Sequence, residues 1–112
     1  MNNVLIVGLG LIGGSIAKAL KASKNDLNVY GFDKSEAVLK AAIGDETINS
    51  YINIDDDFDS IKDNKIDLII ICTPLSITVE ILDLLESKSI FNTNVTITEV
   101  SSSKLLIEEK FG

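Results

Sequence analysis

The chain has 112 residues, 10 of them basic and 17 acidic, so its formal net charge is 10 − 17 = −7. This length is that of one ordinary domain, and a hydrophobic content of 46% is too high for a disordered acidic tail. The acidic balance, with no cluster of Lys or Arg, argues against a protein that binds nucleic-acid phosphates.

Four short apolar runs predict the strands of a sheet. They lie at residues 4–7, 28–32, 66–72 and 95–98, and each has the length of a strand. Runs that are apolar throughout, rather than at every second position, are typical of parallel strands covered on both faces.

Helical patterns fill the segments between these runs. The first covers residues 11–23, where four apolar residues at helical spacing share one face: Ile12, Ile16, Ala19 and Leu20. A second helix is expected to start from an N-cap at Ser35 and run through Ala42, with Gly44 as its stop.

Two more helices are predicted in the second half of the chain. Thr73 and Pro74 form a helix start, an N-cap followed by a first-turn proline, and the apolar stripe behind them consists of Ile77, Ile81, Leu84 and Leu85. Ser103 is the expected cap of a last helix that runs to about Lys110.

The order of the predicted elements indicates the fold class. Strands that alternate with helices form right-handed βαβ units. The expected fold class is therefore α/β, a doubly wound parallel sheet of about five strands in a single domain over residues 1–112.

The strongest motif is a glycine-rich turn after the first strand. Gly8, Gly10 and Gly13 form G-x-G-x-x-G between that strand and the first helix. Gly8 permits the tight turn, the bare backbone at Gly10 lets a pyrophosphate approach, and Gly13 lets the helix pack closely on the sheet. The amides of Leu11 and Ile12 then lie without intrahelical partners at the positive end of the helix dipole. The turn therefore predicts a dinucleotide site.

A carboxylate stands at the spacing that this kind of site requires. Asp33 ends the second strand, 33 − 13 = 20 residues after Gly13, where an acidic side chain accepts hydrogen bonds from the adenosine ribose. A 2′-phosphate about 4 Å away would be repelled by roughly 4 kcal/mol per pair of unit charges, and Lys34 beside it offsets only part of that repulsion. The sequence therefore predicts a Rossmann-type site for NAD, with NADP disfavoured.

The composition argues against several other kinds of chemistry. The chain has no histidine, which removes the commonest general base and metal ligand. The acidic run at residues 55–59 lacks the glycine and distal glutamate of a calcium loop, so no metal site is expected.

The cysteine content and the apolar runs indicate a cytoplasmic protein. Cys72 is the single cysteine, so it cannot form an internal disulfide. It is expected to be packed in the interior. No apolar run approaches the ~20 residues that cross a bilayer, and no basic residue precedes the first apolar run, as it does in a secretory signal.

Four stretches of the sequence resemble one enzyme family: GLGLIGGS at residues 8–15, YGFD at 30–33, DLIIICTP at 67–74 and TEVSSSK at 98–104. They are similar to the N-terminal nucleotide-binding domain of the prephenate and arogenate dehydrogenases of tyrosine biosynthesis. The resemblance implies an NAD-dependent oxidoreductase that oxidatively decarboxylates prephenate or arogenate by hydride transfer from the ring carbinol to nicotinamide. It also implies a homodimer formed through a helical C-terminal domain that is absent from this chain and that completes the pocket for the cyclohexadienyl substrate.

The resemblance also implies roles for two loops. Thr73 and Pro74, after the fourth strand, and Ser101, after the fifth, would contact the nicotinamide half of the cofactor. Ser102 would lie beside the reacting hydroxyl as an accessory catalytic residue.

The segment that ends in Lys104 departs from the family pattern. Glu99 and Ser101 stand where the family usually has Asp and Gly, which leaves the shape of this loop open and weakens the role of Ser102. The family's catalytic histidine has no counterpart in this chain, and Lys104 is the nearest base. We therefore expect the chain to bind NAD and to turn over no substrate by itself.

Two alternatives remain open. The first is a stand-alone NAD-sensing module without chemistry, which the short length and the missing histidine favour, but which leaves the loop from Ser101 to Lys104 without a purpose. The second is the cofactor domain of another β-hydroxyacid-type dehydrogenase or of a pyrroline-carboxylate-type reductase. Both share the glycine turn and the Thr-Pro pair, and the additional Gly14-Ser15 disfavours both.

Overall fold

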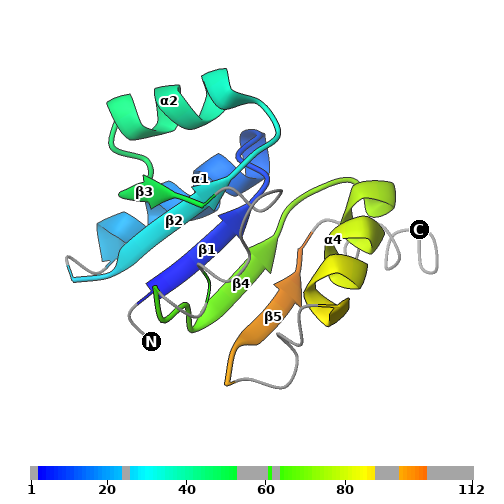
Figure 1. The fold of residues 1–112 in the computed structure, drawn as a ribbon. Helices are drawn as coiled ribbons and strands as arrows, with labels where there is room; N and C mark the ends of the chain where they lie inside the picture. The colour runs from blue at the N-terminus through cyan, green and yellow to red at the C-terminus, as the bar shows by residue number, and fades with distance from the viewer. Residues whose placement is uncertain (1–2, 24–25, 53–60, 62–63, 88–93, 101–112) are drawn as a thin grey trace, which may run out of the picture.

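The computed structural model describes residues 3–23, 26–52, 61, 64–87 and 94–100. These residues form a five-stranded sheet in the order β3-β2-β1-β4-β5 (Figure 1), and all of its strand pairs are parallel. The strands are β1 (Asn3–Val7), β2 (Asn28–Phe32), β3 (Ser50–Tyr51), β4 (Leu68–Ile71) and β5 (Thr96–Glu99). The helices are α1 (Leu11–Ser23), α2 (Glu36–Gly44) and α4 (Leu75–Ser87). The predicted α/β sheet of five parallel strands is confirmed.

The continuous apolar runs are explained by a core on each face of the sheet. Successive residues of a strand point to opposite faces, and in β1 both faces are buried. Leu5 and Val7 pack in a cluster that includes Ile81 and Leu85 of α4. Val4 and Ile6 belong to a second cluster that contains residues of α1 and α2: Ala17, Leu39 and Ala42. In Figure 1, α1 and α2 accordingly cover one face and α4 the other.

The element boundaries were predicted with small errors. β2 and α1 have the predicted limits, whereas β4 is shorter than the run at 66–72 and β5 ends one residue later than expected. Ser35 caps α2 as predicted, because its side chain accepts a hydrogen bond from the Val38 amide at 3.3 Å, but the helix continues through Gly44. β3, with two residues, was not located from the sequence. The expected helix after Ser103 and the acidic run at 55–59 lie outside the described residues.

The predicted buried face of α1 is wrong in part. The fully buried residues of this helix are Gly13 and Ala17, while Ile12 is 46% exposed and Ala19 is exposed as well. Ile16 is only partly buried. The helix lies so close to the sheet that only small side chains fit between them, so the larger apolar ones border the contact instead.

One glycine of the sheet has a packing role that the sequence did not reveal. A Cβ atom on Gly31, in β2, would lie 2.7 Å from Leu9 Cδ1 and 2.9 Å from Ile48 Cδ1. Both of these neighbours are buried. Gly31 therefore makes room for the side chain of Leu9, which follows the first glycine of the turn.

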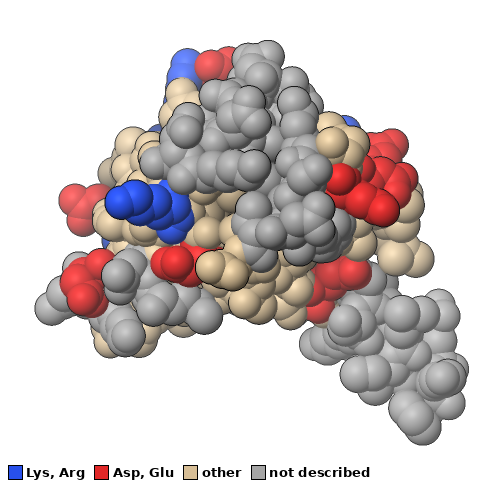
Figure 2. All heavy atoms as spheres, turned by 60° about the horizontal axis from the view of Figure 1, so that its bottom comes forward, with Lys and Arg blue, Asp and Glu red and all other residues tan. Residues whose placement is uncertain are grey.

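The described surface carries its charges in scattered groups. Figure 2 shows acidic side chains at several places around one face, and the Lys side chains visible there do not merge into one basic patch. None of the described helices is both long and apolar enough to cross a membrane.

Candidate dinucleotide-binding site

The glycine turn begins with a residue that must be glycine. Gly8 has a φ of +92°, a backbone conformation that side-chain-bearing residues rarely adopt. Its amide donates to the Phe32 carbonyl oxygen at 2.7 Å, which ties the end of β1 to the end of β2. A Cβ atom here would also lie 2.9 Å from Thr73 Cγ2 and 3.1 Å from the Cys72 carbonyl oxygen. Gly8 is thus required both by its backbone angle and by its neighbours.

The other two glycines of the motif differ in why they are glycine. A Cβ atom on Gly13 would overlap the Gly8 carbonyl oxygen, so close packing of α1 on the turn explains this residue. A Cβ atom on Gly10 would meet no atom of the described residues within 4 Å. Packing within the described residues therefore does not require glycine at position 10, but a ligand that approaches the backbone there would.

Free amides surround this open position. The Gly14 amide donates to the Gly10 carbonyl oxygen at 2.8 Å. The four preceding amides, those of residues 10–13, donate to no acceptor among the described residues. They are the first N–H groups of a helix, which lack intrahelical acceptors and lie at its positive end. The start of α1 therefore offers a set of hydrogen-bond donors suited to an anion.

Asp33 lies beside these amides and already supports the turn. One carboxylate oxygen, Oδ2, accepts the Leu9 amide at 2.9 Å, and the other, Oδ1, accepts the Ser35 amide at 2.9 Å. An ionised carboxylate has about four lone-pair positions, so about two remain for a ligand. Asp33 thus links the glycine turn to the start of α2, a role that the sequence did not predict.

A cleft of about 290 Å³ joins these features at the carboxyl ends of β1, β2 and β4. Six of the predicted cofactor-binding residues line it: Gly8, Gly10, Asp33, Lys34, Thr73 and Pro74. Leu11, Ile12 and Gly13 lie next to it at the start of α1 without lining it. Ser101, Ser102 and Lys104 lie outside the described residues.

Apolar residues that the motifs did not indicate complete the cleft. Phe32, at the end of β2, lines it together with Ile77 and Ile81 of α4. The two isoleucines had been assigned to the buried stripe of their helix, and only the sheet topology shows that the end of this stripe also faces the cleft.

Cys72 packs against one of the two cores, as expected, and it is half-buried. It also borders the cleft. Burial raises the pKa of its thiol, because the charged thiolate is less well solvated there. The thiol is therefore a weaker nucleophile near neutral pH than a free cysteine.

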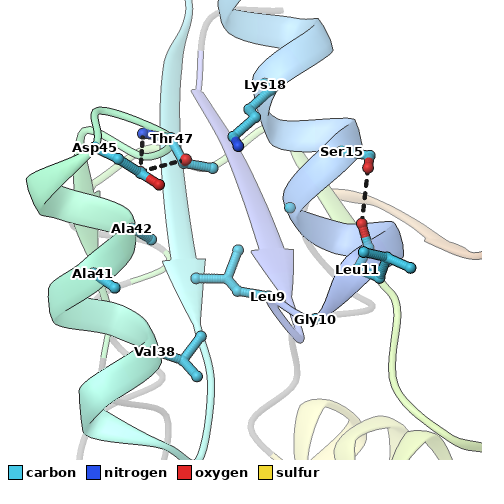
Figure 3. A pocket seen from close by; sticks show the side chains of 11 residues that line it. Leu9, Gly10, Leu11, Ser15, Lys18, Val38, Ala41, Ala42, Asp45 and Thr47 are labelled. Atoms are coloured by element: carbon cyan, nitrogen blue, oxygen red, sulfur yellow. Dashed lines mark hydrogen bonds between the residues drawn. The ribbon is translucent and has the colours of Figure 1, made fainter.

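A second hollow, of about 370 Å³, lies between α1 and α2. Figure 3 shows Lys18 reaching toward it from α1, with Val38, Ala41 and Ala42 facing it from α2. At one end, the hydroxyl and amide of Thr47 donate to the Asp45 carboxylate and lower its pKa.

The second hollow has only Gly10 in common with the cleft. It contains neither the Asp33 carboxylate nor the loop after β4. Although the second hollow is the larger of the two, the cleft is the candidate dinucleotide site, because it combines the glycine turn with the carboxylate at the end of β2. In the part of the chain that the structure describes, no group of three or more His, Cys, Asp or Glu residues is placed to hold a metal ion.

A glycine turn with free amides, followed by an acidic residue at the end of the next strand, defines a Rossmann-type dinucleotide-binding domain. A family profile described as "Prephenate dehydrogenase, nucleotide-binding domain" matches residues 16–111. The chain belongs to this family.

Relatives and solved structures agree with this assignment. The prephenate dehydrogenase of Bacillus subtilis (strain 168) is 34% identical over 107 residues, which are 92% of this chain and 26% of that protein. The structure of A. aeolicus prephenate dehydrogenase, in complex with hydroxyphenyl propionate and NAD+, superposes with a TM-score of 0.74 at 30% identity and covers 88% of this chain and 33% of that one. This chain therefore spans about a quarter to a third of the proteins it matches.

A different class of protein has the same fold. RSP, a Rex-family repressor, in complex with β-NAD+ and operator DNA, matches 99% of this chain and 56% of its own with a TM-score of 0.68. Its sequence is 22% identical, so the likeness shows the fold alone.

Proposed function

We propose that this chain is the NAD-binding domain of an oxidoreductase that oxidatively decarboxylates prephenate or arogenate. Family membership supports this proposal, as does the likeness to an A. aeolicus enzyme whose structure contains NAD+ and hydroxyphenyl propionate. Bound nicotinamide would supply the hydride acceptor of the reaction. The residues of this chain would bind and orient the cofactor.

Groups in the cleft and at the adjoining start of α1 would hold the diphosphate and the adenosine ribose of the cofactor. The free amides at the start of α1, those of Gly10, Leu11, Ile12 and Gly13, would donate to its diphosphate. The remaining lone pairs of the Asp33 carboxylate would accept the adenosine ribose hydroxyls, and its charge would repel the additional phosphate of NADP. Lys34 lines the cleft beside this carboxylate.

The loops after β4 and β5 would contact the nicotinamide half of the cofactor. Thr73 and Pro74 line the cleft at the carboxyl end of β4, the edge at which ligands of doubly wound sheets bind. Ser101 would follow them at the end of β5, and Ser102 would lie beside the reacting hydroxyl of the substrate.

The observation that carries the proposal is the open space at Gly10. Gly8 and Gly13 are explained by backbone conformation or by packing, whereas a Cβ atom at Gly10 would meet none of the described residues within 4 Å. A ligand bound against the backbone is a physical reason for glycine at this position in the turn.

A matched pair of variants tests the proposal. Gly10→Ala and Gly14→Ala make the same change four residues apart, and a Cβ atom at Gly14 would meet only the Leu9 carbonyl oxygen, at 3.8 Å. Both variants are therefore expected to fold. Gly14 lines the second hollow but not the cleft. Calorimetric titration with NAD should show binding that Gly10→Ala weakens by about tenfold or more, the effect of losing one charge-assisted hydrogen bond.

The control decides where the cofactor lies. Gly14→Ala should bind NAD as the wild type does. Equal losses in both variants would place the ligand between α1 and α2, and no NAD binding by the wild-type chain would refute the proposal.

The complete reaction would need groups from outside these residues. Removing a hydride from a carbinol requires a base for the hydroxyl proton, and the 112 residues contain no histidine. We therefore propose that the base is a histidine from a further segment of the enzyme, that a separate helical domain completes the substrate pocket and forms a homodimer, and that the enzyme works in the cytoplasm. NADH formation from prephenate and NAD by these 112 residues alone would contradict this division of roles.

A second candidate is a sensor that binds NAD and performs no chemistry. Its support is the common fold with RSP, but that likeness does not extend to function. The net charge of −7 argues against the binding of operator DNA, so we prefer the oxidoreductase.

A further inference from the structure

Thr78, in the first turns of α4, is a buried polar residue that no motif singled out. It is 1% exposed, and a hydroxyl buried to this degree needs hydrogen-bond partners. Both of its partners belong to Thr73, in the loop that lines the cofactor cleft. Thr78 itself does not line the cleft. The most direct route from the Thr78 hydroxyl to the cofactor is therefore through Thr73, its hydrogen-bond partner.

The two bonds determine which hydroxyl is the donor. Thr78 Oγ1 donates to the Thr73 carbonyl oxygen at 3.0 Å, and the two hydroxyl oxygens lie 2.8 Å apart. A hydroxyl carries one proton. Because the one proton of the Thr78 hydroxyl is used in the hydrogen bond to the carbonyl oxygen, Thr73 must be the donor in the bond between the two hydroxyls. Thr73 therefore has no proton left to offer a phosphate oxygen in the cleft.

The same bonds determine what Thr73 presents to the glycine turn. With its Oγ1 held by Thr78, its methyl carbon Cγ2 faces Gly8, so closely that a Cβ atom on Gly8 would lie 2.9 Å from it. Gly8 and Thr73 both line the cleft and follow the neighbouring strands β1 and β4. The Thr73 methyl thus fills the space beside Gly8, between the glycine turn and the loop after β4.

We propose that Thr78 is a positioning residue for the cofactor: its hydroxyl selects the side-chain rotamer of Thr73 whose methyl rests against Gly8 and sets the spacing between the glycine turn and the loop after β4. This proposal rests on the proposed function, because the ligand of the cleft is taken to be NAD. Without the Thr78 hydroxyl, Thr73 is free to turn its methyl away and the loop is free to shift. The cleft then no longer has one preformed width.

The test uses variants that keep the shape of the side chain and change only its hydrogen bonds. Thr78→Val has the size of threonine without the hydroxyl, and Thr78→Ser keeps the hydroxyl. By calorimetric titration, Thr78→Val should bind NAD about three- to tenfold more weakly than the wild type, the effect of one neutral hydrogen bond. Thr78→Ser should stay within about twofold of the wild type. Ser76→Ala removes an exposed hydroxyl from the same helix and serves as the matched control, with no expected change.

A double variant separates positioning from loss of stability. In Thr73→Val/Thr78→Val both hydroxyls are gone, and at position 73 the second methyl of the introduced valine takes the place of Oγ1, so that a methyl again faces Gly8. Replacing the two bonded hydroxyls by apolar groups of the same shape restores the contact between them, while the Thr73 carbonyl oxygen stays without the Thr78 donor. The double variant should therefore bind NAD better than Thr78→Val alone.

Each other outcome has a definite meaning. Wild-type affinity in Thr78→Val, or equal losses in Thr78→Ser and Thr78→Val, would overturn the inference. So would a double variant no better than Thr78→Val, because Thr73 would then contact the cofactor through its hydroxyl. If Thr78→Val does not fold, Thr78→Ala takes its place: it also lacks the hydroxyl, its affinity for NAD should fall about three- to tenfold, and wild-type affinity would overturn the inference. A wild-type chain that binds no NAD would refute the proposed function instead.

Discussion

Replacing Asp33 should separate a structural role from a binding role of one carboxylate. In Asp33→Ala, the amides of Leu9 and Ser35 both lose an acceptor that now lies at 2.9 Å. Ser35 is exposed, so water replaces its lost partner. Leu9 is only 8% exposed, and leaving its amide unpaired costs about 1–3 kcal/mol. The free energy of unfolding should fall by about this amount, as measured by urea denaturation followed by circular dichroism.

The effect of Asp33→Ala on binding should be of similar size but of different origin. The ribose hydroxyls lose charge-assisted hydrogen bonds, each of about 1.5–3 kcal/mol, so NAD should bind roughly 10- to 150-fold more weakly. Titration calorimetry measures this directly, at a temperature where the variant is fully folded.

Asp33→Asn is the control that isolates the charge. Its side-chain oxygen still accepts the Leu9 amide, so most of the stability should return, whereas the repulsion of a 2′-phosphate is lost. Its preference for NAD over NADP should therefore be smaller than that of the wild type. A folded Asp33→Ala protein with wild-type affinity for NAD would refute the ribose contact, and wild-type stability would refute the role of the Leu9 bond.

Three other predictions follow from single features of the structure. Because burial raises the pKa of Cys72, its alkylation by iodoacetamide should accelerate at a higher pH than that of a free thiol. Saturating NAD should slow the reaction, which mass spectrometry can follow; equal rates with and without NAD would contradict the assigned cleft. The lowered pKa of Asp45 stabilises the fold above the ordinary carboxylate pKa, and this stabilisation is lost as the pH falls through the lowered value. The difference in unfolding free energy between the wild type and Asp45→Asn should therefore be largest near neutral pH and shrink in acid. Gly31→Ala should destabilise the fold by about 1–3 kcal/mol through overpacking, whereas Gly44→Ala, with open space around it, should leave the melting temperature unchanged or raise it.

The features predicted correctly from the sequence are those determined by residues that lie close together in the chain. The apolar runs at β1 and β4 identify strands, because a parallel strand buried on both faces has few polar positions. The turn after β1 and the position of Asp33 just after β2 were also found from the sequence, because their spacing is fixed along one βαβ unit. The cap at Ser35 depends on a bond to Val38, three residues away.

The features that were missed depend on contacts across the fold. β3 has two residues and pairs only with β2, so its sequence carries no pattern of its own. The buried face of α1 was misjudged because hydrophobic periodicity favours large apolar residues such as Ile12, while the close contact with the sheet selects small ones such as Ala17. Gly31 resembles an ordinary strand residue until Leu9 and Ile48 are placed around it.

The cleft shows most clearly why a motif is only part of a site. Its two walls come from the turn after β1 and the loop after β4, which are distant in the chain and adjacent in the sheet. The sequence indicates both walls because each has its own local pattern, but it contains no sign of what holds them at a fixed spacing. A backbone bond from the Cys72 amide to the Val7 carbonyl oxygen joins the two strand ends, and two side chains add to it: the Thr78 hydroxyl bonds the loop after β4, and the Asp33 carboxylate, which itself lines the cleft, bonds the glycine turn. A dinucleotide binds well only if both walls are in place before it arrives, because the ordering of a loose loop would subtract from its binding free energy. These supporting contacts should therefore affect affinity as strongly as some residues that touch the ligand.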